Sequence, residues 1–188
     1  MILALFDDEF SFVNERVQRI PYEEAPSIGF KGKETLGSAR GYIWSRSLPI
    51  MLDHLIVGTG PDTFFTEFPQ GDYLAKLYAY SGETPIVDKP HNLYLQIGIQ
   101  HGGIALIAFL IFIGAYLVNS FRLYAFRNSY SVQEAIGVAI LLSIIGYLGA
   151  GIFNDSVVSV APIFWTLLGI GIASNLLNTR VRDQENSN

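Results

Sequence analysis

The sequence predicts an all-α integral membrane protein in which a large polar loop precedes three transmembrane helices. Half of the 188 residues are hydrophobic. The mean hydropathy is +0.33, which is more hydrophobic than an average soluble domain. Three long stretches in the second half of the chain also contain no Asp, Glu, Lys or Arg. These two observations give the fold class.

The uncharged stretches have the length that a membrane helix requires. Residues 104–121 contain no charged side chain over 18 positions. With the two glycines before them, they would span about 30 Å as a helix. Residues 135–153 and 157–177 are two further stretches of this kind. We therefore predict three transmembrane helices.

The first residues of the chain resemble the end of another membrane helix. Residues 1–6 are apolar, and the acids Asp7, Asp8 and Glu9 follow at once. A signal peptide has a basic start and a longer apolar stretch, and neither is present. We therefore expect residues 1–6 to be the last turns of a transmembrane helix, and the chain to be a C-terminal fragment.

The arginines predict the orientation. Arg122 and Arg127 follow the first uncharged stretch, and Arg180 and Arg182 follow the third, so both pairs lie on one side of a three-helix arrangement. The positive-inside rule places that side in the cytoplasm. The predicted division of the chain is a helix stub (1–6), an extracytoplasmic loop (7–101), transmembrane helices (102–121, 135–153 and 157–177) and a cytoplasmic tail (178–188).

Composition excludes several kinds of site. Residues 1–101 hold 13 of the 17 acidic side chains and only 8 of the 12 basic ones, so nucleic acid is not an expected partner. No cysteine is present, which excludes disulfides and thiolate metal sites. His91 and His101 would lie roughly 15 Å apart along one helix. We therefore expect no metal site and no cofactor.

The loop contains a predicted helix and a predicted turn. Apolar residues recur at helical spacing between residues 39 and 55, and Pro49 should bend or interrupt that helix. Two interpretations fit equally: an amphipathic helix on or near the membrane surface, and a helix packed on a core. The Gly58–Asp62 cluster is better explained as a plain turn than as a phosphate loop, because no lysine follows at the required spacing.

His91 is the leading catalytic candidate. Asp88 or Lys89 can precede a helix whose first turn contains Pro90 and His91, because proline is tolerated there. The unpaired N–H groups of a helix start suit a phosphate, and the positive field favours the neutral imidazole that a general base requires. The alternative is that His91 only caps the helix and marks the water interface.

Arg40 is the second candidate. An arginine beside a membrane surface can bind phosphate through its planar fork of donors. An ordinary salt bridge with a neighbouring acid is the alternative for Arg40, and Arg46 competes for the same phosphate-binding role.

Three elements, in this order, resemble the O-antigen ligase/polymerase family. They are Arg40-Gly41-Tyr42-Ile43-Trp44, then Gly58-Thr59-Gly60-Pro61-Asp62-Thr63-Phe64, then His91-Asn92 with nine residues before Gly102. The third element is similar to that family's signature of His, then Asn, Ser or Gln, then nine residues and Gly. The resemblance extends from about Arg40 to Leu177 and includes the helix end at Phe153-Asn154-Asp155.

The resemblance implies a metal-independent membrane glycosyltransferase, related in architecture to the C-type class. Such enzymes act on the outer face of the bacterial cytoplasmic membrane. The implied donor is an undecaprenyl-diphosphate-linked glycan, and the acceptor is a glycan or lipid-linked sugar, either lipid A core (ligases) or another repeat unit (polymerases). Arg40 would hold the donor diphosphate, and His91 would activate the acceptor hydroxyl. Residues expected to contribute to substrate binding are Trp44, Arg46, Asn92 and Tyr94.

Two other functions are alternatives. Full members of that family have around ten or more spans and a further arginine on an earlier external segment. The chain is therefore alternatively a truncated, non-catalytic membrane protein or an interaction module. A transporter segment ranks last, because transporters usually carry ionisable residues within their spans and the three predicted spans carry none.

Overall fold

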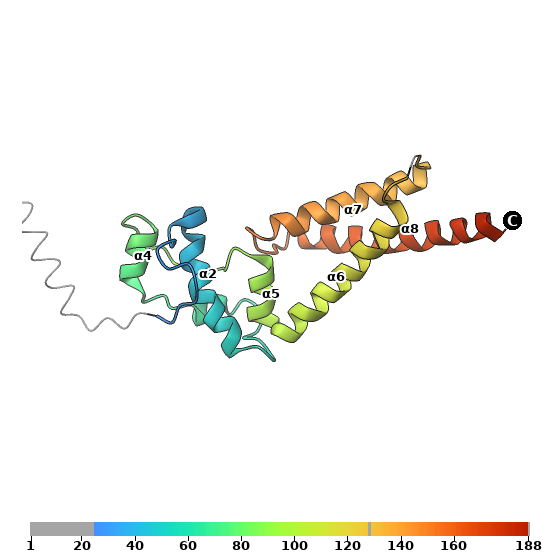
Figure 1. The fold of residues 1–188 in the computed structure, drawn as a ribbon. Helices are drawn as coiled ribbons and strands as arrows, with labels where there is room; N and C mark the ends of the chain where they lie inside the picture. The colour runs from blue at the N-terminus through green and yellow to red at the C-terminus, as the bar shows by residue number, and fades with distance from the viewer. Residues whose placement is uncertain (1–24, 128, 188) are drawn as a thin grey trace, which may run out of the picture.

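The computed structural model describes residues 25–127 and 129–187, and every regular element in these ranges is a helix (Figure 1). The helices are α2 (Leu36–Asp53), α3 (Phe64–Glu67), α4 (Tyr73–Ala79), α5 (Leu93–His101), α6 (Gly103–Tyr124), α7 (Val132–Ala150) and α8 (Ala161–Ser187). The predicted all-α class is confirmed. The stub expected at residues 1–6 lies outside the described residues.

Helices α6, α7 and α8 are long and apolar enough to cross a membrane. They contain 22 residues in α6, 19 in α7 and 24 in the apolar part of α8, Ala161–Gln184. At 1.5 Å per residue these lengths give about 28 to 36 Å, which matches a bilayer core of about 30 Å. The three predicted membrane helices are therefore present in the described part of the chain.

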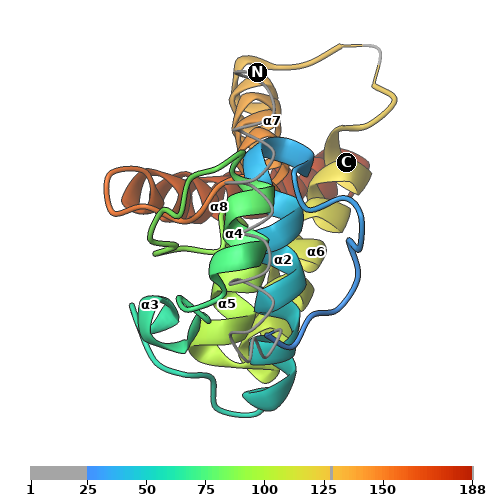
Figure 2. The ribbon, with the colours of Figure 1, turned by 90° about the vertical axis from the view of Figure 1, so that its left-hand side faces the viewer.

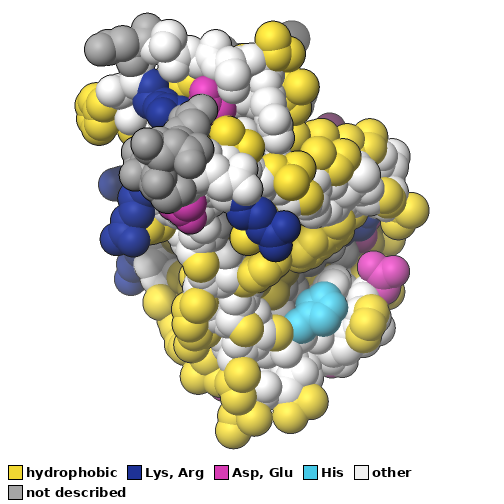
Figure 3. Space-filling model, turned by 90° about the vertical axis from the view of Figure 1, so that its right-hand side faces the viewer, with side chains coloured by type: hydrophobic (Ala, Val, Ile, Leu, Met, Phe, Trp, Pro, Cys, Tyr) yellow, Lys and Arg dark blue, Asp and Glu magenta, His cyan; other side chains and the backbone are white. Residues whose placement is uncertain are grey.

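The loop and the basic ends of the helices lie at opposite ends of the molecule. Figure 1 shows α2, α4 and α5 grouped at one end, from which α6 leaves, α7 returns and α8 leaves again. The C-terminal ends of α6 and α8 therefore share the far end. Figure 3 looks onto that end and shows Lys and Arg side chains gathered there. Arg122, Arg127, Arg180 and Arg182 belong to these helix ends and the α6–α7 connection, so both arginine pairs lie on one side, as predicted.

Buried polar side chains join α6 to α8 within the bundle. The Asn175 amide donates to the Ser120 hydroxyl over 2.7 Å, and the Asn178 amide donates to the Tyr124 hydroxyl over 3.0 Å. A β-carbon at Gly171 would lie 2.5 Å from the Tyr116 hydroxyl oxygen, so the helices approach more closely there than a side chain would allow. Small residues and hydrogen bonds of this kind hold helices together where lipid removes the hydrophobic driving force.

Helix α2 forms the centre of the loop's own core. Its residues Ala39, Tyr42, Ile43 and Ile50 are buried together with side chains from α3, α4 and α5. Figure 2 shows α2, α4 and α5 side by side. The structure therefore favours the second interpretation of this segment, a helix packed on a core.

Proline 49 does not interrupt α2, although the sequence predicted a bend or an interruption there. A proline in a helix leaves the carbonyl four residues earlier without its usual donor. That carbonyl belongs to Ser45, and it accepts from the Ile28 N–H over 2.9 Å. The non-helical dihedral angles in α2 are instead at Gly37, Ser38 and Ala39, all at positive φ.

A buried ion pair connects α2 to the start of α4. The Arg46 Nε atom lies 3.0 Å from Asp72 Oδ2, and both side chains are buried. The guanidinium also lies over the Tyr42 ring, 4.9 Å from its centroid. Nearby, Lys76 is buried and donates to the Gln70 backbone and side chain. Burial lowers the pKa of Lys76, and the Asp72 carboxylate partly offsets that effect.

Replacing Asp72 with Ala should destabilise the loop by about 3–5 kcal/mol, because the buried Arg46 guanidinium would lose the carboxylate at 3.0 Å. The measurement is thermal unfolding in detergent, followed by Trp44 fluorescence in a Trp165→Phe background, since these are the chain's two tryptophans. Asp53→Ala is the control. Asp53 is exposed at the end of α2, so its loss should change stability by less than about 0.5 kcal/mol. Equal melting temperatures for the two variants would contradict this role of the ion pair.

Candidate active site

The residues between Asn92 and Gly102 are the helix α5 itself. The Asn92 side-chain oxygen accepts from the N–H groups of Tyr94 and Leu95, each over 2.9 Å, so Asn92 is the N-cap. Asparagine is among the best N-cap residues because it pairs donors that the helix start leaves free. The prediction that Pro90 and His91 form the first helical turn, after Asp88 or Lys89, was therefore wrong. His91 lies just before the helix.

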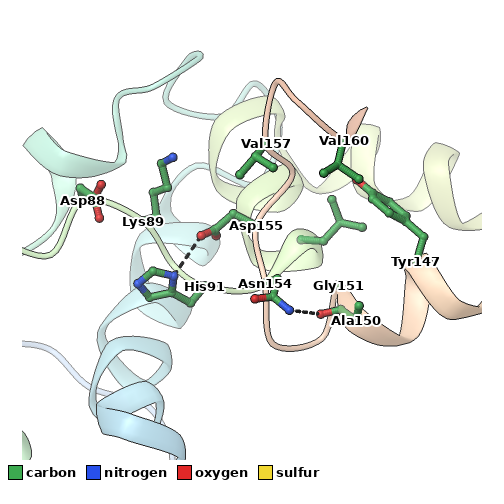
Figure 4. A pocket seen from close by; sticks show the side chains of 11 residues that line it. Asp88, Lys89, His91, Tyr147, Ala150, Gly151, Asn154, Asp155, Val157 and Val160 are labelled. Carbon is green, nitrogen blue, oxygen red and sulfur yellow. Dashed lines mark hydrogen bonds and ion pairs between the residues drawn. The ribbon is translucent and has the colours of Figure 1, made fainter. Parts of the chain in front are cut away.

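His91 and Asn92 share one carboxylate, that of Asp155 in the α7–α8 connection. His91 Nδ1 lies 3.1 Å from Asp155 Oδ2, and the Asn92 N–H donates to Asp155 Oδ1 over 3.2 Å (Figure 4). The Asp155 side chain is 5% exposed and that of His91 is 42% exposed. Because a carboxylate only accepts, a neutral His91 would carry its proton on Nδ1 and leave Nε2 as the acceptor.

The backbone of His91 adopts a conformation that side chains rarely take. Its φ is +48°, in the left-handed region, whereas the φ of Asn92 is −160°, which is extended. Such a conformation costs free energy in a residue with a side chain and persists where its surroundings hold it. The hydrogen bonds of Asp155 to both residues provide that support.

Trp44 and Asn92 bind the protein's own backbone around His91. Trp44 Nε1–H donates to the Pro90 carbonyl over 3.0 Å, and its ring packs near Phe153, with 6.0 Å between the centroids. The Asn92 amide donates to the Ile152 carbonyl over 2.9 Å. These two predicted substrate-binding residues therefore hold the segment that carries His91.

Arg40 attaches to the same connection as His91. Its Nε–H donates to the Phe153 carbonyl over 3.2 Å, and Nη1–H donates to the Gly37 carbonyl over 2.7 Å. Within residues 25–127 and 129–187, no carboxylate forms an ion pair with Arg40. The structure thus brings Arg40 and His91 to the same segment, Arg40 through the Phe153 carbonyl and His91 through the Asp155 carboxylate.

The remaining predicted residues lie in two different places. Arg46 is buried against Asp72, away from the α7–α8 connection. Tyr94 lies in the first turn of α5, where its hydroxyl donates to the Leu148 carbonyl over 2.9 Å. Burial raises the pKa of Tyr94.

A pocket of about 530 Å³ opens beside His91, within the range of roughly 300–1,000 Å³ typical of small-molecule sites. Figure 4 shows Lys89, His91 and Asp155 at one side of it and Tyr147 and Val160 at the other. One wall is therefore polar and the other apolar. Its lining residues are Asp88, Lys89, His91, Leu93, Tyr147, Ala150, Gly151, Asn154, Asp155, Val157 and Val160. Among the residues that the structure describes, no cluster of three or more His, Asp or Glu could hold a metal ion.

A family model described as O-antigen ligase matches residues 1–110, which is more than half of the chain. The chain belongs to the O-antigen ligase family. The matched region includes Arg40, the Gly58–Asp62 turn and the whole of α5 with His91 before it. Comparisons with curated proteins and with solved structures found no match.

The Gly58–Asp62 turn closes the C-terminal end of α5. The N–H groups of Thr59 and Gly60 donate to the carbonyls of Ile99 and Gln100 over 2.8 and 3.0 Å. These amides satisfy carbonyls that a helix end leaves free, so they are not available to a phosphate. The structure agrees with the turn interpretation of this segment.

Gly102 is the residue that makes this junction possible. Its φ is +90°, and a β-carbon there would lie 2.6 Å from the Ile56 carbonyl oxygen. The next residue, Gly103, donates its N–H to the Leu55 carbonyl over 2.6 Å. The signature of His-Asn, nine residues and Gly therefore describes a helix with a cap at each end.

Sequence reasoning assigned no role to Asp155. The available signal was that Asp155 is the one acidic residue between the second and third uncharged stretches.

Gly102→Ala should destabilise the protein by more than about 1 kcal/mol, because alanine is strained at positive φ and its methyl group would meet the Ile56 backbone. Gly114→Ala is the matched control. Gly114 lies within α6 with open space around it, so alanine there should be neutral or stabilising by up to about 1 kcal/mol. Thermal unfolding in detergent measures both, and a Gly102→Ala variant as stable as Gly114→Ala would contradict the tight junction.

Proposed function

We propose that this O-antigen ligase family member transfers a glycan from undecaprenyl diphosphate to a hydroxyl of an acceptor sugar, in bacterial cell-envelope polysaccharide biosynthesis. The observation that carries the proposal is the His91–Asp155 pair at the polar wall of the pocket. Family membership supplies the general class of donor and acceptor. The same residues would serve a ligase or a polymerase, because both activate a sugar hydroxyl.

The proposed reaction is a single displacement in which His91 is the general base. The acceptor hydroxyl donates to His91 Nε2 and attacks the anomeric carbon of the donor glycan. As the new C–O bond forms, the bond from that carbon to the diphosphate oxygen breaks, and undecaprenyl diphosphate leaves with the electron pair. The proton moves to Nε2, and the Asp155 carboxylate stabilises the resulting imidazolium. The reaction inverts the anomeric configuration and uses no metal ion or nucleotide sugar.

Arg40 and Lys89 would bind the diphosphate. Arg40 is held by the carbonyls of Gly37 and Phe153, which fixes its guanidinium before a ligand arrives. Lys89 lines the pocket, and no described residue forms an ion pair or hydrogen bond with it. A cation that is already held in place, as the Arg40 guanidinium is, stabilises growing negative charge in the transition state without reorganising.

The apolar wall and the position of the pocket support a lipid-linked donor. Tyr147, Val157 and Val160 form a surface that an isoprenoid chain can contact. The pocket lies at the loop end of α6–α8, opposite the arginine-rich end. By the positive-inside rule, we propose that the loop is extracytoplasmic and that the protein lies in the bacterial cytoplasmic membrane.

His91→Ala should lower glycan transfer by about 10²–10⁴-fold, which is the usual contribution of a general base. Asp155→Asn keeps the side-chain volume but removes the charge that supports the imidazolium. It should lower transfer by about 10–100-fold, from the 1.5–3 kcal/mol of a charge-assisted hydrogen bond. The measurement is the amount of glycan transferred from undecaprenyl diphosphate in membranes that contain equal amounts of each variant.

Asp183→Asn is the matched control for Asp155→Asn. Asp183 is exposed near the end of α8, far from the pocket, so transfer should not change. Unchanged transfer in His91→Ala would exclude His91 as the base. If the unmodified chain shows no transfer in these membranes, the alternative of a non-catalytic membrane protein or interaction module is favoured instead.

Arg40→Ala should lower transfer by about 10–100-fold, and Arg40→Lys should restore part of the loss. Lysine keeps the charge but not the planar fork that binds two phosphate oxygens at once. The defect should appear mainly as a higher KM for the lipid-linked donor, with the KM for the acceptor unchanged. Arg180→Ala, an exposed arginine in α8, is the control. A raised acceptor KM with an unchanged donor KM would contradict the assignment of Arg40 to the diphosphate.

A further inference from the structure

We infer that Leu55, Ile56 and Val57, which follow the C-cap residue His54 of α2, insert into the membrane as a lipid anchor for the loop. We call these residues the apolar turn. Their exposed fractions are 46%, 73% and 80%. Three consecutive apolar side chains that are this exposed are unusual on a water-facing surface and mark a site of contact with another apolar phase.

The position of the apolar turn identifies lipid as that phase. The Leu55 carbonyl accepts from the N–H of Gly103, the first residue of α6, over 2.6 Å. Ile104 and Ile107 in the first turns of α6 are also exposed, at 63% and 59%. The apolar turn is thus bonded directly to the beginning of a candidate membrane span and continues its apolar surface. Figures 1 and 2 both show the end of α2 beside the junction of α5 and α6.

Helix α2 itself does not expose a continuous apolar surface of this kind. Its apolar side chains Tyr42, Ile43 and Ile50 are buried in the loop core. Leu52 in its last turn is 48% exposed and lies three residues before Leu55, at the same end of the helix as the apolar turn. Polar contacts close the turn on its other side, where the Gly58 N–H donates to the His54 carbonyl over 3.0 Å. Insertion is therefore centred on the apolar turn at the C-terminal end of α2.

Insertion of the apolar turn would fix the height of the site above the membrane. The turn leads into Gly58, Thr59 and Gly60, which close the C-terminal end of α5. His91 lies just before the other end of the same helix. A lipid anchor at one end of α5 therefore places the pocket at a defined depth, independently of which substrate the pocket binds.

The absence of cysteine in the chain allows a direct test with single labels. Ile56→Cys and Val57→Cys are labelled with an environment-sensitive nitrobenzoxadiazole dye, and the full chain is reconstituted in phosphatidylcholine vesicles. Tyr78→Cys is the water-facing control, because Tyr78 is 63% exposed on α4, far from α6–α8 in Figure 1. Ile111→Cys is the lipid-facing control, because Ile111 is 67% exposed within α6.

Nitroxide-labelled lipid should quench most of the fluorescence of labels on the apolar turn, and aqueous iodide should quench little of it. The label on Ile111→Cys should behave in the same way. The label on Tyr78→Cys should show the reverse. Quenching by iodide at positions 56 and 57 as strong as at 78 would overturn the inference. Protection from both quenchers would also overturn it, because a protein partner and not lipid would then cover the turn.

Discussion

The carboxylate of Asp155 connects the loop to the membrane helices. It is almost fully buried and accepts from His91 and from the backbone of Asn92 at once. Around it, the Leu93 N–H donates to the Gly151 carbonyl over 2.7 Å, and the Asn92 side chain donates to Ile152. A buried charge is tolerated only when hydrogen bonds compensate its lost hydration. The need to satisfy this one carboxylate therefore fixes the conformation of the segment that contains His91.

The membrane helices and the site differ in how far the sequence could predict them. A stretch without charges is a local property, so residues 104–121 could be recognised without knowing what they contact. The pairing of Asn92 with Asp155 joins positions 63 residues apart, and no periodicity reports such a contact. The start of α5 was missed for a local reason. The tolerance of helix starts for proline suggested Pro90, whereas the capping amide of Asn92 decides the boundary.

The family signature encodes the shape of the site more than its contacts with substrate. Asn92, Gly102 and Trp44 all bind or accommodate the protein's own backbone. His91, by contrast, presents part of its ring to the pocket. A motif with fixed spacing is expected when the residues at its two ends cap one helix, because the helix length then sets the spacing. The nine residues of α5 are that spacing.

Helix α5 also couples the two ends of the proposed site mechanically. Nine residues at 1.5 Å each make a rigid segment of about 13 Å. One end is held by the α7–α8 connection through Asp155, and the other by the turn at Gly58 and the start of α6. The N–H groups of Leu93, Tyr94 and Leu95 at one end and the carbonyls of Ile99 and Gln100 at the other are hydrogen-bonded. A shift of the loop relative to α6 must therefore move His91 or break one of these bonds. The position of His91 relative to the candidate membrane helices is therefore a consequence of how α5 is capped.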